Sequence, residues 1–259
     1  MGVEIDLSGR AVLVTGGTRG IGAGIAEVLL RAGAQVYVCS RREPEQLPAA
    51  GGARAEFLPA DVRDADQVAA LVDEVVRRAG RLDSVVNNAG GAPPADTATA
   101  SPRFHAKVVE LNMLAPLAVS QRAWPVLRDT GGSITMISSM AARRPAPTIA
   151  AYAAAKAGLE SLTSSLALEF APSVRVNAIS VGVARTENFR EYFGQEAADS
   201  GFADGIPLER PAEPVEVGHA CAFLASPLAA YVTGAVLPVD GGGAPHPYLK
   251  QVAREFAQR

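Results

Sequence analysis

The chain has 259 residues, of which 48% are hydrophobic and 20% are charged, and its formal net charge is −3. This composition suits a globular protein, the length suits a single α/β domain spanning residues 1–259, and the charge argues against a nucleic-acid partner. The N-terminus has no signal-peptide core, and no apolar run reaches about 18 residues, so we expect no membrane segment. Cys39 and Cys221 lack metal-ligand spacing. They predict reduced thiols, no metal site and a cytoplasmic location.

The first predicted strand, residues 12–14, runs directly into the glycine-rich turn TGGTRGIG at residues 15–22. A helix to Ala32 follows. Gly16, Gly20 and Gly22 would let the backbone turn tightly and approach a pyrophosphate, while the helix N-terminus supplies N–H groups and a positive dipole. The alternative is a plain tight turn between a strand and a helix, which is a common feature.

The second predicted strand, residues 35–39, ends at Ser40 and is followed by Arg41 and Arg42. In dinucleotide-binding folds this strand end faces the adenosine ribose, and an acidic residue there would repel a 2′-phosphate. No acidic residue is present, whereas Arg41 and the turn residue Arg19 would attract that phosphate. The pattern predicts NADP, although either arginine alone fits a solvated loop equally well.

Residues 51–52 predict a loop, and a third strand, residues 56–58, leads to Asp61 and Val62. Asp61 is either a hydrogen-bond acceptor for an adenine amino group or an ordinary turn residue. Asp64 and Gln67 predict a capping box at the start of a helix that ends at Ala79. A fourth strand, residues 85–86, then runs into NNAG at residues 87–90.

A long helix is predicted from Ser101-Pro102 to about Leu127, with serine as the cap and proline in the first turn. Inside it, Pro116 lacks the N–H that the Asn112 carbonyl would normally accept, so the helix should kink there. The freed carbonyl could bind a water molecule. A purely structural kink is the alternative.

The clearest chemical signal lies between a fifth strand, residues 133–137, and the alanine-rich helix that follows it. Tyr152 and Lys156 are four residues apart and share one helix face, and Ser139 lies at the strand end. A nearby ammonium favours the phenolate and lowers a tyrosine pKa, which suits proton transfer. The alternative is an interfacial tyrosine with a solvated lysine. Only three of the 24 basic residues are lysines, so a surface cation here would more often be arginine.

The remaining elements complete an alternating pattern of strands and helices. A sixth strand covers residues 175–179, a helix runs from Pro214 to about Ala225, and a seventh strand covers residues 235–239. The pattern predicts a Rossmann fold, a doubly wound seven-stranded parallel sheet with helices on both faces. The aromatic-bearing connection at residues 184–213 predicts a substrate lid, or alternatively a disordered insertion. The tail, residues 244–259, has Tyr248, Val252 and Phe256 at helical spacing.

These motifs occur in the order and spacing of one enzyme family. They are TGGTRGIG (15–22), Asp61-Val62, NNAG (87–90), Asn112, Ser139, YAAAK (152–156), Asn177-Ala178 and VTG…VDGG (232–242). Over nearly the whole chain the sequence resembles the short-chain dehydrogenase/reductase family, including its 3-oxoacyl-[acyl-carrier-protein] reductases. The resemblance implies a catalytic tetrad of Asn112, Ser139, Tyr152 and Lys156. Ser139 has the family's distance to Tyr152, and Ser138 should point to the other strand face.

The motifs and the resemblance together predict the cofactor-binding residues. These are Thr15, Gly16, Thr18, Arg19, Gly20, Ile21, Gly22, Ser40, Arg41, Asp61, Val62, Asn88, Ala89, Gly90, Tyr152, Lys156, Ala184 and Thr186. One departure concerns Val181-Gly182, where the family usually has Pro-Gly. We expect Val181 to form an apolar wall for the nicotinamide ring and to position it more loosely.

The resemblance implies hydride transfer between C4 of the nicotinamide and a carbonyl carbon. Tyr152 would donate the proton, Lys156 would lower the Tyr152 pKa and hold the nicotinamide ribose, and Ser139 would donate to the carbonyl oxygen. The Asn112 carbonyl would anchor a water that resupplies the proton through Lys156. We therefore expect an NADPH-dependent reductase of a ketone, aldehyde or 3-oxoacyl substrate.

Two alternatives remain open at the level of sequence. A 3-oxoacyl-[acyl-carrier-protein] reductase would need a basic surface for an acidic partner. The helix after Lys156 instead carries Glu160 and Glu169, although Arg128, Arg143 or Arg144 could serve. The other alternative is a regulator that senses NADP without turnover. Loss of a tetrad residue would favour it, and none is lost.

The resemblance also implies a homotetramer, or alternatively a homodimer, in which the two helices beside the site pair between subunits and the last strand makes a second interface. We expect their outer faces to present small and apolar residues that allow close packing. These residues are Ala115, Ala118, Ala154, Gly158, Leu162 and Leu166.

Overall fold

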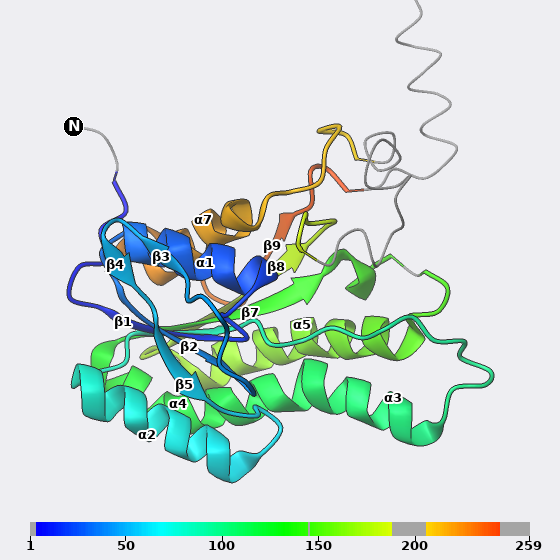
Figure 1. The fold of residues 1–259 in the computed structure, drawn as a ribbon, viewed down its shortest axis with the longest axis horizontal. Helices are drawn as coiled ribbons and strands as arrows, with labels where there is room; N and C mark the ends of the chain where they lie inside the picture. Colours follow the sequence, from blue (N-terminus) through cyan, green and yellow to red (C-terminus); the bar gives the residue numbers. More distant parts are fainter. Residues whose placement is uncertain (1–3, 145, 188–205, 244–259) are drawn as a thin grey trace, which may run out of the picture.

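A computed structural model of the chain describes residues 4–144, 146–187 and 206–243. Its centre is a seven-stranded parallel sheet of strand order β5-β2-β1-β6-β7-β8-β9 (Figure 1). The strands are β1 Ala11–Thr15, β2 Gln35–Ser40, β5 Glu56–Pro59, β6 Ser84–Asn87, β7 Ser133–Ser139, β8 Arg175–Val181 and β9 Val236–Val239. The predicted doubly wound sheet is confirmed, and every predicted strand lies within two residues of its observed bounds.

Helices cover both faces of the sheet. The helices α1 Gly20–Arg31 and α7 Pro214–Ala225 pack together on one face. The other face carries α2 Ala65–Ala79, α3 Pro102–Val109, α4 Ala115–Thr130 and α5 Ala150–Phe170 (Figure 1). Alternate strand residues fill the two resulting cores, because successive side chains point to opposite faces. In β1, for example, Leu13 belongs to one core while Val12 and Val14 belong to the other.

The order in which the chain fills the sheet determines where a ligand can bind. The chain begins at the centre with β1, moves outward through β2 to β5, and returns to β6 on the other side of β1. The connections after β1 and β6 therefore leave in opposite directions and open a crevice at the carboxyl ends of these strands. Open α/β sheets bind their ligands at such a reversal point.

Two predicted segments differ in the structure. Residues 49–54 form a small antiparallel pair, β3 Ala49–Ala50 and β4 Ala53–Arg54, instead of a plain loop. The predicted helix over residues 101–127 is interrupted, because a π-helical turn, η1 Glu110–Leu114, separates α3 from α4. The Ala115 N–H donates to the Glu110 carbonyl across that turn. The kink predicted from Pro116 therefore takes the form of one wide turn containing Asn112.

The predicted capping box is half present. The Asp64 carboxylate accepts hydrogen bonds from the N–H groups of Asp66 and Gln67, as expected for a cap of α2. The Gln67 side-chain oxygen, however, accepts from the N–H of Asp61 at 2.9 Å instead of from Asp64. Gln67 thus holds the loop that leads into the helix.

The prediction of which residues lie on the outer faces of the two pairing helices needs correction as well. Ala115 is 3% exposed and Leu166 is 4% exposed, so both belong to the core and not to an outer face. Ala154 is exposed, and Gly158 lies where α5 meets η1, because a Cβ there would be 2.5 Å from the Met113 sulfur. The predicted outer positions are therefore correct only in part.

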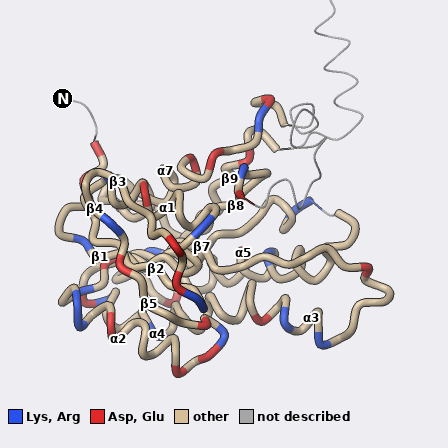
Figure 2. The backbone as a smooth tube through the Cα atoms, in the orientation of Figure 1, with Lys and Arg blue, Asp and Glu red and all other residues tan. Residues whose placement is uncertain are grey.

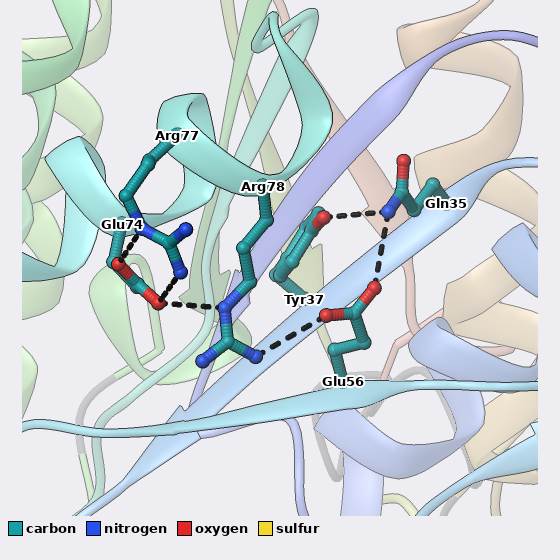
Figure 3. Close-up of polar contacts among 6 residues, drawn as sticks. All are labelled: Gln35, Tyr37, Glu56, Glu74, Arg77 and Arg78. Atoms are coloured by element: carbon teal, nitrogen blue, oxygen red, sulfur yellow. Dashed lines mark hydrogen bonds and ion pairs between the residues drawn. The ribbon is translucent and has the colours of Figure 1, made fainter.

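Charged residues of both signs are interspersed along the described chain (Figure 2). At the β5 edge of the sheet they form the polar cluster of Figure 3. The Gln35 amide donates to the Tyr37 hydroxyl at 2.6 Å and to Glu56 at 3.0 Å, while Arg78 bridges Glu56 and Glu74. Burial, with Glu56 nearby, raises the pKa of Tyr37 to about 12. Charges on an edge strand hinder pairing with another chain. Among the described residues, no helix is both long and apolar enough to cross a bilayer.

Candidate active site

The glycine-rich turn between β1 and α1 is held by the residues that directly follow β6. The Asn88 side-chain amide donates to the carbonyls of Thr15 and Gly16, both at 3.0 Å. A Cβ on Gly22 would lie 2.2 Å from the Gly16 carbonyl oxygen and 2.5 Å from the Asn88 amide nitrogen. Only glycine fits at position 22, because the backbone and the Asn88 amide occupy the space of a side chain.

Thr15 makes a second link between the turn and β6. Its hydroxyl accepts hydrogen bonds from the N–H groups of Asn88 and Ala89, both at 3.0 Å. Gly16 and Gly20 adopt left-handed backbone conformations, with φ of +62° and +54°, which glycine tolerates best. The turn is therefore built and fixed by the protein's own contacts.

The N-terminus of α1 accepts an anionic group in this structure. The Gly20 N–H donates to the Glu187 carboxylate at 3.2 Å. A Cβ on Gly20 would lie 3.4 Å from the Thr186 methyl carbon, so the segment ending at Glu187 passes over the turn. Unpaired N–H groups and the helix dipole favour negative charge at this position. The turn, where Thr18 and Ile21 are half-buried, thus fits the pyrophosphate of a dinucleotide.

The end of β2 carries the residues predicted to select the cofactor. The Ser40 hydroxyl donates to the Arg42 carbonyl at 2.5 Å. The side chains of Arg19, Arg41 and Arg42 are exposed. No described acidic residue occupies this strand end, so the site presents positive charge.

Asp61 has a partner that sequence reasoning missed. Both of its carboxylate oxygens accept hydrogen bonds from the Arg63 guanidinium, at 2.9 and 2.5 Å. This contact, aided by the Arg63 N–H and by the charge of Arg41, lowers the pKa of Asp61 to about 2. Val62 is 7% exposed and belongs to the core. Asp61 is therefore an ionised residue, fixed by Arg63, just after the carboxyl end of β5.

Lys156 and Tyr152 lie on one face of α5, as predicted from their spacing. Lys156 is 4% exposed, and its ammonium donates to the Ile137 carbonyl of β7 at 2.8 Å. The ammonium nitrogen lies 5.7 Å from the centre of the Tyr152 ring. Burial lowers the pKa of Lys156 to about 8. The lysine is thus a buried group held against a strand end, and not a solvated surface cation.

Asn112 reaches the same place from the π-helical turn. It is fully buried, and its amide exchanges two hydrogen bonds with the backbone of Gly91 and donates a third to the Val108 carbonyl. A Cβ on Gly90 would lie 2.8 Å from the Asn112 amide oxygen and 3.2 Å from the Lys156 nitrogen. Gly90 therefore lets Asn112 and Lys156 approach one point at the end of β6.

Ser139 ends β7, in register with Val181 of β8. Its hydroxyl accepts a hydrogen bond from the Ala141 N–H at 3.2 Å and caps the short 3₁₀ turn η2 Met140–Ala142. Val181 is 3% exposed and packs in the core, so the structure does not present it as an open apolar wall. A Cβ on Gly182 would lie 2.7 Å from the Asp240 Cα, which makes glycine necessary beside the end of β9.

An apolar hollow beside Tyr152 was also missed by sequence reasoning. Residues from the loop after β6, from α3 and from the start of α5 line it, among them Pro93, Phe104 and Ile149. These lining residues form no sequence motif, so the hollow became apparent only from the fold. Ala184, one of the predicted cofactor-binding residues, forms an isolated parallel β-bridge with Ala212. The greater part of the predicted lid, residues 188–205, and the predicted tail, residues 244–259, lie outside the described residues.

The fold and the site together define a dinucleotide-binding protein with a polar, partly buried centre at the sheet's carboxyl end. Residues 16–243 match the family described as enoyl-(acyl carrier protein) reductase. L-Fucose dehydrogenase from Oryctolagus cuniculus is 39% identical over 249 residues, which cover 91% of this chain and 85% of the relative.

Solved structures agree. A ligand-free aldohexose dehydrogenase from Thermoplasma acidophilum superposes with a TM-score of 0.87 at 31% identity, covering 93% of this chain and 96% of that one. A structure described as a short-chain alcohol dehydrogenase from Sinorhizobium meliloti gives 0.84 at 33% identity, covering 93% and 98%. The chain belongs to the short-chain dehydrogenase/reductase family, whose members are oxidoreductases that use a nicotinamide cofactor.

Proposed function

We propose that this protein is an NADP(H)-dependent oxidoreductase that transfers a hydride between the nicotinamide and a carbonyl or secondary-alcohol substrate. The observation that carries the proposal is the buried Lys156, which lies beside Tyr152 on α5. Its ammonium and the Asn112 amide oxygen both lie close to Gly90. A lysine is seldom buried without a function or a charged partner.

The roles of the chain's own residues follow from their chemistry. Tyr152 donates a proton to the developing alkoxide, or removes one from the alcohol in the reverse direction. The Lys156 ammonium stabilises the phenolate that remains and binds the nicotinamide ribose, and Ser139 donates to the carbonyl oxygen. The nicotinamide, when bound, supplies or accepts the hydride. The Asn112 carbonyl holds a water that returns the proton through Lys156.

NADP is the proposed cofactor, because Ser40 and Arg41 stand at the end of β2, where the family resemblance places the adenosine ribose, Arg19 lies in the glycine-rich turn, and no acidic residue takes the place of Ser40. Thr186 and Ala184 would contact the nicotinamide end, and Asp61 the adenine. Charge-assisted hydrogen bonds to a phosphate are worth about 1.5–3 kcal/mol each, or one to two decades of affinity.

The test is turnover of NADPH with a panel of ketones, aldehydes and 3-oxoacyl esters. Tyr152→Phe should abolish turnover while NADPH binding stays nearly intact, because only the proton donor is removed. Lys156→Ala should weaken both. Wild-type rates in Tyr152→Phe would show that the assigned chemistry is wrong.

A second candidate is reduction of an acyl group carried on an acyl carrier protein, which the description of the matching family favours. The partner would be acidic. Of the three arginines considered for it, Arg143 is bound to Glu160 and Arg128 to Asp129. Arg128 also lies in the last turn of α4, just before β7 begins, and so at the opposite end of the sheet from Ser139, whereas Arg144 follows η2 on the side of Ser139. The candidates differ in one measurement: a carrier-dependent enzyme would reduce the carrier-linked acyl group far faster than the free ester.

We further propose a homotetramer, with a homodimer as the alternative. Beyond the helical faces, the edge strand β9 lies among exposed apolar side chains, including Leu237, Tyr231 and Leu168, of which Tyr231 is fully exposed and Leu168 is 82% exposed. Exposed apolar groups at an open sheet edge are typical of subunit contacts. A reducing, cytoplasmic location fits the two cysteines, which are buried free thiols.

A further inference from the structure

We propose that Glu160 is a positioning residue for this reaction, because it fixes the Ser139 hydroxyl relative to Tyr152 and Lys156. The inference rests on the proposed function. Tyr152, Lys156 and Glu160 follow one another at intervals of four residues and so share one face of α5. Two of them reach the reaction centre, and the third lies one turn further along the same row.

Glu160 binds the chain on both sides of Ser139. Its Oε1 accepts a hydrogen bond from the Ser138 hydroxyl at 3.0 Å, and its Oε2 accepts from the Arg143 Nε at 2.9 Å. One carboxylate therefore attaches both the end of β7 and the end of η2 to the same point on α5. Ser139 lies between the two contacts.

The contact between Glu160 and Ser138 is shielded from water, unlike an ion pair on the surface. Glu160 is 9% exposed and Ser138 is 3% exposed, so the contact between them is shielded from water. The Arg143 backbone N–H also donates to the Met140 carbonyl, which closes η2. A buried charge that loses a partner is costly, and for this reason the arrangement is held in one geometry.

Lys156 adds a further contact between α5 and the end of β7. Its ammonium binds the Ile137 carbonyl, and the Ser138 hydroxyl lies 3.4 Å from the Lys156 carbonyl. Residues 137, 138 and 143 are thus attached in succession to positions 156 and 160 of α5. A hydrogen-bond donor must stand within a few tenths of an ångström of the developing oxyanion to be effective. The Glu160 contacts provide that restraint for Ser139.

The experiment compares Glu160→Gln with Glu74→Gln, a matched control. Glu74, like Glu160, accepts hydrogen bonds with both carboxylate oxygens, in its case from Arg77 and Arg78 (Figure 3), but it lies on α2, which carries none of the proposed catalytic residues. Glu160→Gln should lower kcat about tenfold, with KM and the Kd for NADPH within twofold. Arg143→Gln, at an exposed position, should give a smaller loss of the same kind. Glu74→Gln should leave kcat unchanged.

A double-mutant cycle with Ser139→Ala separates positioning from a general structural effect. If Glu160 acts through Ser139, Glu160→Gln should have little further effect on kcat in the Ser139→Ala background. Hydrogen exchange of the amides in residues 139–144 supplies a readout that does not depend on turnover. These amides should exchange faster in Glu160→Gln than in wild type or Glu74→Gln.

The possible failures are distinguishable. An unchanged kcat in Glu160→Gln, a tenfold loss that persists in the Ser139→Ala background, or unchanged exchange at residues 139–144 would overturn the positioning role while the oxidoreductase remains. If wild-type protein turns over no carbonyl or alcohol substrate, the proposed function fails, and faster exchange would then show only a structural clamp.

Discussion

Replacing Lys156 by methionine tests whether this lysine is buried at an energetic cost. Burial lowers its pKa to about 8 from the usual 10.5. Between these two pH values the folded protein has lost a proton that the unfolded chain still binds. The unfolding free energy of the wild type must therefore rise with pH across this range, by on the order of 3 kcal/mol. Lys156→Met removes the titrating group and with it this rise.

As the pH rises from 7.5 to 10.5, the unfolding free energy of wild type should increase by about 3 kcal/mol relative to that of Lys156→Met. Below pH 8 both states of the wild type are largely protonated, so the burial cost is present there and the variant is relatively most stable. Loss of the hydrogen bond to the Ile137 carbonyl offsets part of that advantage by about 1–3 kcal/mol. This offset changes the level of the difference but not its dependence on pH.

Urea unfolding followed by the fluorescence of Trp124, the single tryptophan, measures these free energies. Lys107→Met is the matched control, because Lys107 is exposed on α3, and its pH dependence should follow that of wild type. Titrating groups away from Lys156 are common to all three proteins and cancel in the differences, and a Tyr152→Phe background in all three removes the neighbouring phenol that Lys156 acts on. A stability difference for Lys156→Met that is constant from pH 7.5 to 10.5 would refute the reasoning.

Three further predictions concern the cofactor turn, cofactor choice and assembly. Gly22→Ala should weaken NADPH binding at least tenfold in a fluorescence titration, because its Cβ would overlap the Gly16 carbonyl; unchanged binding would contradict the geometry of the turn. Arg41→Ala should weaken NADPH binding roughly tenfold and leave NADH binding unchanged; tighter binding of NADH by the wild type would exclude the NADP assignment. Light scattering should give the mass of four subunits, or of two, and Leu168→Glu should lower it; the mass of one subunit in wild type would rule out both assemblies.

The sheet and most helices could be predicted because their signals are local. Short apolar runs, glycine-rich turns and caps such as Ser101 each depend on a few neighbouring residues. Ser101 indeed caps α3, with its hydroxyl accepting from the Phe104 N–H. The helix from Pro214 to Ala225 has the predicted bounds. The alternation of strands and helices predicts a parallel sheet, but its strand order comes from the structure.

Small apolar residues do not by themselves identify an outer helix face. The prediction placed Ala115 outward because it is small and apolar, but such residues also fit a core, and Ala115 is buried. The same ambiguity applies to Leu166. Alanine and leucine surround α5 on most sides, so no polar stripe marks its solvent face.

Contacts between distant residues were beyond sequence reasoning. Glu160 meets Arg143 across 17 residues and Ser138 across 22, and both contacts exist only because α5 packs along the end of β7. The position of Glu160, four residues after Lys156, was the available signal, but a charge on a helix is usually solvated. Arg63, two residues from Asp61, was overlooked because a turn arginine has many possible orientations.

The reversal of strand order beside β1 has an evolutionary consequence. Everything proposed to distinguish one dinucleotide from another comes from the strands on one side of the reversal, β1, β2 and β5. The acid–base residues come from β7, η1 and α5, later in the chain and on the other side. The hydrogen bonds of Thr15 with Asn88 and Ala89 join the two sets. Cofactor preference and substrate range can therefore change through substitutions in separate parts of the chain, while the packing of α1 on α7 and the pairing of β1 with β6 keep the two parts in one structure.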